Sequence, residues 1–225
     1  MKILIGIPAY NEEQMIGKVI RSLFGIAEKI GADILVVNDG STDKTYEIVK
    51  SPKVTLVNHL LNRGLGGALK TIFAYAKVNG YDILLTFDAD GQHKAKDIPK
   101  LIGPLIKNHT DVVIGTRWNN LKKVPVSRLI INQFANIITY LLFGIWTADS
   151  QSGFRAFNRK AIQKIHLETD GMEVSSEFFR EIYKNKLRFV EVPIDAIYTT
   201  YSTKKGQKLS NAANVFFQLL LRLLR

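Results

Sequence analysis

Apolar and polar residues alternate in blocks along the first half of the chain. Short runs that are apolar at nearly every position are typical of strands buried on both faces of a sheet. These runs predict strands at Ile3–Pro8, Ile34–Val37, Val54–Val57, Ile83–Phe87 and Val112–Gly115. The segments between them carry apolar residues three and four positions apart, which is typical of helices that cover a sheet. They predict helices at Glu12–Ile30, Gly64–Asn79 and Ile98–Lys107, and a short helix, capped by Ser41, Thr42 and Asp43, that ends near Lys50. We therefore expect an α/β fold, with a mostly parallel central sheet and helices on both faces.

The pattern is less regular after Thr116. We expect strands at Phe154–Phe157 and Phe189–Pro193, and an extended segment at Ile197–Tyr201. Helices are expected at Ser127–Ile145, Arg159–His166, Val174–Lys186 and Leu209–Arg225. No internal repeat or linker interrupts the sequence. We therefore divide the chain into one domain, residues 1–208, and a C-terminal amphipathic helix, residues 209–225.

Charge divides the chain into two unlike halves. The 225 residues carry a net charge of +11. Before Arg117 there are 14 basic and 12 acidic residues, and from Arg117 onward there are 17 basic and 8 acidic. This surplus predicts that the second half meets an anionic partner, which could be a nucleic acid, a nucleotide or an anionic membrane. The absence of cysteine excludes a disulfide framework and thiolate chemistry.

The start of the chain and its longest apolar run bear on its location. Met1–Pro8 leads directly into a strand, so we expect no signal peptide. The run Ile137–Trp146 is too short to cross a membrane as a helix. We therefore expect a cytoplasmic protein that is peripheral on the inner face of the cell membrane.

Polar side chains gather where the predicted strands end. Tyr10 and Glu12 follow the first strand, Asp39 follows the second, and Asp88 and Asp90 follow the fourth. The carboxyl ends of parallel strands form the usual ligand site of an open sheet, so these residues predict a single site. A helix cap or turn would explain Asp39 alone. It explains Asp88 and Asp90 less well, because two carboxylates so close together repel each other unless a cation lies between them.

A divalent cation would suit the Asp88–Asp90 pair. Hard cations prefer oxygen ligands and keep positions open for phosphate oxygens. Gln92 and His93 are near enough in sequence to add a ligand.

The glycines of Asn62–Gly67 allow two interpretations. The segment lacks the full G-x-G-x-x-G spacing, and the chain contains no P-loop motif. The glycines would serve either close packing of a helix and a tight turn or contact with a phosphate.

Five segments occur in an order and at a spacing that resemble a known family. They are Ile7–Glu13, Val37–Asp43, Asn62–Gly64, Asp88–His93 and Ser152–Arg155. Together they resemble the inverting GT-A-fold glycosyltransferases, specifically the dolichyl- or polyprenyl-phosphate mannose and glucose synthases. The resemblance covers residues 1–207. It implies the GT-A, or nucleotide-diphospho-sugar transferase, fold, with residues 1–116 as a nucleotide- and metal-binding half and residues 117–208 as an acceptor half.

The resemblance also implies roles for single residues. Pro8, Tyr10, Glu12 and Asp39 would hold the nucleoside of a nucleotide-sugar. Asp88 and Asp90, with Gln92, would hold Mg²⁺ or Mn²⁺ on the diphosphate. Arg117 would lie near phosphate, and Asp149 and Gln151 would line the sugar and acceptor end.

Two of these assignments stay open. Asp149 would orient the acceptor or accept a residual proton, but it could equally cap a helix end or pair with Arg155. Arg155 would be either a ligand of the acceptor phosphate or a structural ion-pair partner. The sequence also departs from many relatives after Pro193, where Lys204, Lys205 and Lys208 could supply the cations for the acceptor phosphate.

The implied reaction is an in-line displacement of a nucleoside diphosphate, with the metal neutralising the charge that develops on the leaving group. GDP-mannose or UDP-glucose would be the donor, and dolichyl or polyprenyl phosphate the acceptor. A phosphate monoester has a second pKa of about 6, so the acceptor is largely a dianion at neutral pH. Such a nucleophile scarcely needs a general base.

Two predicted helices bear on the membrane. In Asn211–Arg225 the polar side chains, among them Arg222 and Arg225, share one side of the helix. In Ser127–Ile145 the polar side chains lie opposite a wide apolar face. Such helices suit the membrane interface, but packing against the core or a second subunit would give the same pattern. We favour membrane or oligomer contact for Asn211–Arg225 and leave both alternatives open for Ser127–Ile145.

Two other functions remain as alternatives. A glycosyltransferase of the same fold could act on a sugar hydroxyl of a glycan, which would need a general base, and Asp149 is the best candidate for it. A basic protein could also bind nucleic acid. The basic residues form no dense run and no recognition motif is visible, so we expect no nucleic-acid partner.

Overall fold

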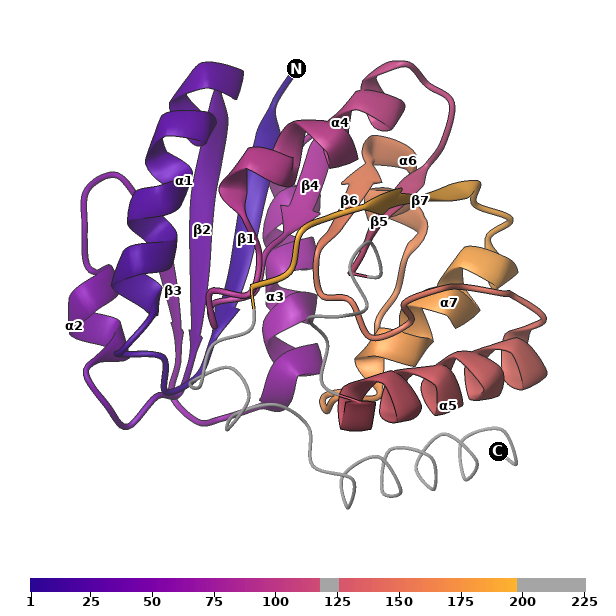
Figure 1. Cartoon of the computed structure of the whole chain (residues 1–225). Helices are drawn as coiled ribbons and strands as arrows, with labels where there is room; N and C mark the ends of the chain where they lie inside the picture. The colour runs from indigo at the N-terminus through magenta and orange to yellow at the C-terminus, as the bar shows by residue number, and fades with distance from the viewer. Residues whose placement is uncertain (118–125, 198–225) are drawn as a thin grey trace.

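The structure is a computed structural model that describes residues 1–117 and 126–197. Within these residues, seven strands form one sheet in the order β3-β2-β1-β4-β6-β5-β7 (Figure 1). The strands are β1 (Ile3–Ala9), β2 (Ala32–Asp39), β3 (Thr55–His59), β4 (Ile83–Thr86), β5 (Val112–Thr116), β6 (Arg155–Asn158) and β7 (Phe189–Pro193). All pairs are parallel except those of β6, which runs antiparallel to both β4 and β5.

Helices alternate with the strands as the sequence predicts. They are α1 (Ile16–Ile30), α2 (Thr45–Val49), α3 (Gly64–Val78), α4 (Ile98–Ile106), α5 (Val126–Phe143), α6 (Arg159–Lys164) and α7 (Val174–Lys184), with a 3₁₀ turn, η1 (Ala95–Asp97), before α4. The predicted start of the first helix at Glu12 is wrong by four residues, because the chain makes a turn at residues 12–15 before α1 begins. Asp43 accepts a hydrogen bond from the backbone of Thr45 at 2.9 Å, beside the start of α2.

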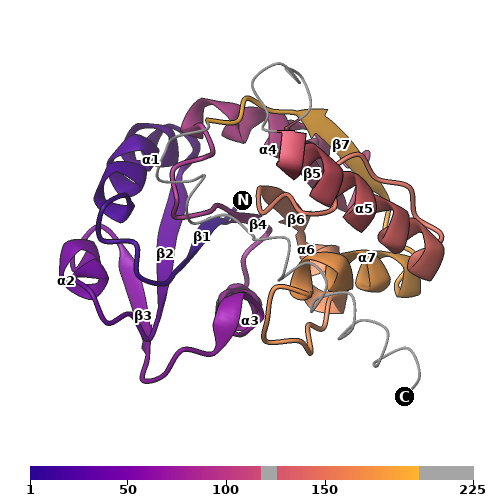
Figure 2. The ribbon, with the colours of Figure 1, turned by 60° about the horizontal axis from the view of Figure 1, so that its bottom comes forward.

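The sheet is covered on both faces, and each face has its own core. Adjacent residues of a strand point to opposite faces, so Leu4 and Ile5 of β1 enter different cores. One core joins the sheet to α1 and α4, through residues such as Leu23 and Leu101. The other joins it to α3, α6 and α7, through residues such as Ile72. Figure 2 shows α1 and α4 on one side of the sheet and α3 and α6 on the other.

Strand β6 brings the second half of the chain to the end of β4. The sequence predicts a strand here but not its direction. Because β6 is antiparallel, with Arg155 opposite Thr86, the residues that precede Arg155 lie beside those that follow Thr86. The segment with Asp149 and Gly153 therefore reaches the same edge of the sheet as Asp88.

Helix α5 is amphipathic, but its polar side faces inward. Asn132, Asn136 and Thr139 are buried, whereas Ile137 and Leu141 are exposed. This is the reverse of the usual arrangement, in which the apolar stripe of a surface helix faces the core.

The membrane predictions are tested only in part. None of the helices in residues 1–117 and 126–197 is long and apolar enough to cross a membrane. The helix predicted at Asn211–Arg225, and nearly all of the extended segment predicted at Ile197–Tyr201, lie outside the described residues.

Candidate active site

Asp88 and Asp90 follow β4 directly, and the turn after them holds both carboxylates. His93 lies with its Nε2 2.8 Å from Oδ2 of Asp88. Gln92 donates its backbone N–H to Oδ1 of Asp90 at 3.0 Å and its side-chain amide to Oδ2. Gly153, just before β6, lies against Asp88 so closely that a Cβ there would collide with the carboxylate. The fourth strand and the sixth therefore build this site together.

The surroundings shift the pKa values of the two carboxyl groups in opposite directions. Burial raises the pKa of Asp90, and the negative charge of Asp88 raises it further. Burial acts in the same direction on Asp88, but the hydrogen bond and charge of His93, with the charges of Arg117 and Arg155, outweigh it and lower the Asp88 pKa. A cation between the two carboxylates would remove their repulsion.

The donor set fits a hard divalent cation that is shared with a substrate. Asp88, Asp90 and the amide oxygen of Gln92 are oxygen donors of the kind that Mg²⁺ and Mn²⁺ take. In the described part of the chain, no group of three or more His, Cys, Asp or Glu side chains could hold a metal ion. The remaining ligands would therefore come from water and from substrate phosphates, as is usual for Mg²⁺.

The residues after β1 and β2 are tied to each other. Asn11 donates its backbone N–H to Ser41 at 2.9 Å, and its side-chain oxygen accepts from the backbone of Thr42 at 2.8 Å. Glu12 is buried and its backbone N–H donates to Thr45 at 2.7 Å. Of the predicted nucleoside ligands, Pro8 lies in β1, Tyr10 is exposed just after it, and Glu12 follows in the same loop.

Asp39, the remaining predicted nucleoside ligand, anchors the start of α3. It is buried, and it accepts backbone hydrogen bonds from Arg63 at 3.0 Å and from Gly64 at 2.8 Å. Nδ1 of His59 lies 2.6 Å from Oδ1 of Asp39, and Nε2 of His59 lies 2.9 Å from the Thr71 hydroxyl. His59 was not among the residues predicted from the sequence. A histidine next to two exposed leucines carries no signal until β3 places it opposite Asp39.

The glycines that follow Asn62 serve close packing. The backbone N–H groups of Gly66 and Gly67 donate to the carbonyl oxygen of Asp170, at 2.8 and 3.2 Å. A Cβ at Gly64 or Gly66 would collide with the backbone at Asp170 or Thr169. The structure therefore supports the packing interpretation of this segment, because the N–H groups of Gly64, Gly66 and Gly67 are bonded within the chain.

Arg117 and Asp149 form a two-point ion pair. Arg117 donates Nε to Oδ2 of Asp149 at 2.7 Å and Nη2 to Oδ1 at 2.6 Å, and its backbone N–H reaches Oδ2 at 3.2 Å. Asp149 is fully buried, whereas the Arg117 side chain keeps some exposure. The salt bridge that we considered between Asp149 and Arg155 is wrong, since the partner is Arg117. The helix-cap alternative for Asp149 is also not observed.

The loop that carries Asp149 is clamped from two sides. The side-chain amide of Asn136, on α5, donates to the carbonyl oxygen of Ala148 at 2.7 Å and accepts from the backbone of Ser150 at 2.9 Å. Glu191, on β7, accepts from the Thr147 hydroxyl at 2.6 Å and from the backbone of Ala148 at 2.9 Å. These contacts fix the two peptide groups on either side of Asp149.

Arg155 lies inside the protein. It is 3% exposed, and its Nη2 donates to the carbonyl oxygens of Ser150 at 2.9 Å and Ser175 at 3.3 Å. Its guanidinium also packs on the ring of Phe178, 4.5 Å from the centroid. Burial lowers the Arg155 pKa to about 10, against the opposing charges of Asp88 and Asp149. This environment favours the structural alternative over the phosphate ligand, with carbonyl oxygens in place of the carboxylate partner that we expected.

The remaining acceptor residues are only partly described. Gln151 is half-buried beside Ser150, in the turn that leads to β6. Lys204, Lys205 and Lys208 lie outside the described residues. The last described residue, Ile197, donates its backbone N–H to the carbonyl oxygen of Gln92 at 2.9 Å. The end of the described chain thus lies against the Asp90–Gln92 turn.

Residues 4–166 match the protein family described as glycosyl transferase family 2. The chain belongs to glycosyl transferase family 2. It is therefore a glycosyltransferase, and the enzyme class inferred from the five motifs is confirmed.

Relatives of this glycosyltransferase cover nearly its whole length. An uncharacterised protein of Methanocaldococcus jannaschii is 43% identical over 98% of this chain and 92% of its own. The UDP-N-acetylglucosamine–dolichyl-phosphate N-acetylglucosaminyltransferase of Methanococcus voltae is 38% identical over 96% of this chain and 93% of its own. This likeness supports the resemblance to enzymes that glycosylate lipid phosphates.

A solved structure shows the same fold. The glucosyl-3-phosphoglycerate synthase of Mycobacterium tuberculosis, in complex with Mn²⁺, UDP and phosphoglyceric acid, superposes with a TM-score of 0.76 at 20% identity. The match covers 98% of this chain and 78% of that one. The GT-A fold predicted for this glycosyltransferase is confirmed.

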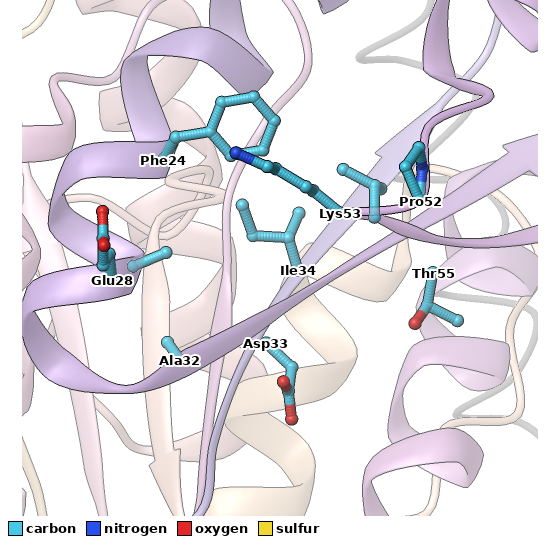
Figure 3. A pocket seen from close by; sticks show the side chains of 10 residues that line it. Phe24, Glu28, Ala32, Asp33, Ile34, Pro52, Lys53 and Thr55 are labelled. Atoms are coloured by element: carbon cyan, nitrogen blue, oxygen red, sulfur yellow. The ribbon is translucent and has the colours of Figure 1, made fainter.

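A separate cavity of about 450 Å³ is lined by residues around the starts of β2 and β3 (Figure 3). Its lining includes Phe24 and Glu28 of α1, Asp33 at the start of β2, and Lys53 and Thr55 around the start of β3. Strands of the glycosyltransferase begin here, whereas Asp88, Asp90 and Asp149 lie where strands end. None of the lining residues belongs to the five motifs, so this cavity is distinct from the candidate active site.

Proposed function

We propose that this glycosyltransferase moves a hexose from a nucleotide-sugar to the phosphate of a dolichyl or polyprenyl lipid, with inversion. The observation that carries the proposal is the meeting of two unlike groups at one sheet edge. The Asp88–Asp90 pair suits a metal-bound diphosphate, and the Arg117–Asp149 pair offers a guanidinium, which suits an anionic acceptor. We retain GDP-mannose and UDP-glucose as donors and add UDP-N-acetylglucosamine, because the relative from Methanococcus voltae is named for that donor.

Asp88, Asp90 and Gln92 would hold Mg²⁺ or Mn²⁺, and Pro8, Tyr10, Glu12 and Asp39 would hold the nucleoside. The bound metal would neutralise charge on the departing diphosphate. A complex of the Mycobacterium tuberculosis synthase with Mn²⁺ and UDP supports this assignment. Gly153 would help to aim Asp88, since any side chain there would displace the carboxylate.

The acceptor phosphate would attack the anomeric carbon in line with the bond to the diphosphate. One carbon–oxygen bond forms to the acceptor phosphate, and the bond to the nucleoside diphosphate breaks. Arg117 would orient the acceptor phosphate and offset the repulsion between two anionic substrates. Residues 117–208 would thus form the acceptor half, with Gln151, Lys204, Lys205 and Lys208 nearby, opposite the donor half of residues 1–116.

A sugar hydroxyl is less suited to this site as the acceptor. A hydroxyl would need a general base, and Asp149 is the candidate for it. Both oxygens of the Asp149 carboxylate accept hydrogen bonds from Arg117, and the side chain is fully buried. We therefore assign Asp149 the role of positioning Arg117. Because no general base then remains for a hydroxyl, the acceptor must be a nucleophile that is already ionised, such as a phosphate.

A lipid acceptor implies contact with a membrane. The exposed apolar residues of α5, which include Ile130, Phe134, Ile137 and Leu141, suit the membrane interface. Asn211–Arg225 would add a second amphipathic helix. We propose a peripheral enzyme on the cytoplasmic face of the cell membrane, and the positive charge of the second half then needs no nucleic-acid partner.

The test is a donor panel with the full chain. Polyprenyl phosphate is incubated with radiolabelled GDP-mannose, UDP-glucose or UDP-N-acetylglucosamine, in Mg²⁺, Mn²⁺ or a chelator. We expect labelled lipid from one donor, only in the presence of metal. Asp90→Ala should remove the activity, whereas Asp82→Ala, at an exposed carboxylate at the start of β4, should retain it. Folded protein that labels no lipid with any of these donors would overturn the proposal.

A further inference from the structure

Two neighbouring leucines are exposed in the connection between β3 and α3. Leu60 is 94% exposed and Leu61 is 78% exposed. Single exposed apolar residues are ordinary on soluble proteins, and Val78, at the far end of α3, is itself 84% exposed. The leucine pair differs from Val78 because two large apolar side chains stand together and directly precede the residues that bond Asp39.

The exposure of the leucine pair follows from the way its backbone is held. Gly40 has a φ of 67°, and the backbone of Leu61 and Asn62 packs so closely on it that a Cβ would collide with them. The side chain of Asn62 donates to the carbonyl oxygen of Asp39 at 3.3 Å, and the backbone of Arg63 donates to its carboxylate at 3.0 Å. The connection is therefore fixed to the end of β2, and the leucine side chains are left in solvent.

The connection between β3 and α3, which carries the leucine pair, and helix α5 lie at the same end of the molecule, where the parallel strands end (Figure 1). In the sheet order, β3 is at one edge, and β4 and β6, which carry the candidate active site, lie between β3 and β5. Helix α5 follows β5 in the chain. The exposed leucines and the exposed apolar residues of α5 therefore stand at the same end, with the site-bearing strands β4 and β6 between β3 and β5.

Described basic residues near the exposed apolar side chains favour a lipid surface. Arg117 follows β5 directly, and residues 126–148, which include α5, contain no aspartate or glutamate. Arg63 follows the leucine pair directly. Basic residues near exposed apolar side chains are attracted to anionic lipids, and a bilayer accepts leucine side chains without a shaped pocket.

We infer that Leu60 and Leu61 insert into the bilayer that carries the acceptor, as a contact in addition to the proposed amphipathic helices. The inference rests on the proposed function, because a lipid phosphate places the acceptor in a bilayer. Two contacts on either side of the site would fix the tilt of the enzyme. The carboxyl end of the sheet would then face the membrane, where the acceptor phosphate is presented.

A fluorescent label tests the insertion directly. The native chain has no cysteine, so Leu61→Cys and the matched control Val78→Cys each give a single attachment point. Each labelled full chain is mixed with vesicles of phosphatidylcholine and phosphatidylglycerol. We expect the emission at residue 61 to shift to the blue and to be quenched by brominated acyl chains, and the emission at residue 78 to stay unchanged. Vesicle-bound protein with a label at residue 61 that remains in water would overturn the inference.

Vesicle sedimentation gives an independent measurement. The double variant L60S/L61S should partition about tenfold more weakly than the native chain, because two buried leucine side chains are lost from the interface. Val78→Ser should partition as the native chain does. Transfer to a short-chain prenyl phosphate in solution should be unchanged in L60S/L61S, and transfer to the vesicle-bound acceptor should fall.

The outcomes separate this inference from the proposed function. Neither the label nor sedimentation needs a donor or an acceptor, so their failure is distinct from failure of transfer. Equal partition of L60S/L61S and the native chain would overturn the inference even if lipid is glycosylated. A native dimer that L60S/L61S dissociates, with vesicle binding unchanged, would also overturn it and assign the pair to a second copy of the chain.

Discussion

Helices α1 and α5 are both amphipathic, but the protein uses their faces in opposite ways. In α1 the apolar residues, such as Ile20 and Leu23, are buried against the sheet. In α5 the amide of Asn136 is buried, and Ile137 and Leu141 are exposed. The two helices have the same kind of sequence pattern, so the pattern alone does not determine which face enters the protein.

The difference has a physical cause in what each helix covers. Helix α1 covers apolar strand residues and is stabilised by removing its apolar side chains from water. Helix α5 covers the loop that carries Asp149, whose peptide groups need hydrogen-bond partners when they are buried. Asn132 and Asn136 supply those partners through the Ala148 carbonyl oxygen. Helix α1 therefore buries its apolar surface in the ordinary way, and helix α5 leaves apolar side chains exposed.

Truncating one leucine on each helix tests this comparison most strongly. Leu23→Ala should lower the free energy of unfolding by about 2–5 kcal/mol, because it leaves a cavity in a packed core. Leu141→Ala should change it by less than about 0.5 kcal/mol, because the side chain is 74% exposed. Urea unfolding measures both values. Equal losses would mean that α5 buries its apolar face as α1 does.

A methyl group at Gly153 tests the point where the two halves meet. Gly153→Ala should lower kcat/KM about a hundredfold, because the Cβ would displace the Asp88 carboxylate from the position in which we propose it binds metal. Gly25→Ala, within α1 and with open space around its Cβ, is the control and should retain activity. A fully active Gly153→Ala enzyme with unchanged metal affinity would remove Asp88 from the proposed site.

The Arg117–Asp149 pair tests how the acceptor half works. Arg117→Lys and Asp149→Asn should each lower kcat/KM by about ten- to a hundredfold, because each breaks the two-point ion pair. The double variant should be little worse than either single one, since the residues act as one unit. Losses that multiply, together with an altered pH–rate profile in Asp149→Asn, would instead indicate that Asp149 is a general base.

The buried amide of α5 should have a smaller effect. Asn136→Ala should lower kcat about tenfold and leave the donor KM unchanged, because it releases the peptide groups on both sides of Asp149. Asn132→Ala removes only one bond to Ala148, at 3.2 Å, and should have a weaker effect. If the two variants behave alike, the bridging contact of Asn136 is not what positions the loop.

We expect the smallest effect from Asp111, a carboxylate outside the candidate active site, on the free energy of unfolding. Hydrogen bonds from the Arg188 backbone, Lys160 and Asn158 outweigh the effect of burial and lower the Asp111 pKa. A lowered native pKa adds stability above the unfolded value of about 4, and that stability is lost as the pH falls through the native pKa. Asp111→Asn should therefore cost about 1 kcal/mol at neutral pH and flatten the acid limb of the stability curve. The free energy of unfolding is measured as a function of pH for both proteins. If Asp111 contributes nothing, Asp111→Asn and the native protein will lose stability equally as the pH falls.

Strands β1, β2, β4 and β5 could be predicted because nearly all of their residues are apolar and buried. Strand β3, at the sheet edge, has no buried residue, and its predicted bounds, Val54–Val57, differ from the observed Thr55–His59. The direction of β6 could not be predicted, because the four residues of this strand do not indicate which strands they will pair with. The partner of Asp149 depended on that direction, so the sequence suggested Arg155, and the structure brings Arg117 instead. His59 and Glu191 were missed for the same reason, since only the pairing of β3 with β2 and the placement of β7 give them their partners.

The orientation of α5 could not be predicted from the pattern of polar and apolar residues in its sequence. The sequence separated its polar residues from its apolar ones correctly, and both orientations were consistent with that pattern. Only the buried peptide groups of residues 147–150 decide between them, and these groups are not visible in the sequence of the helix.

The central claim is that a lipid phosphate, and not a hydroxyl, receives the sugar. The most direct measurement compares polyprenyl phosphate with the polyprenol of the same chain length as acceptors for the best donor, with the full chain and Mn²⁺ or Mg²⁺. We expect labelled product from the phosphate alone. Transfer to the polyprenol at a comparable rate, abolished by Asp149→Asn, would contradict it.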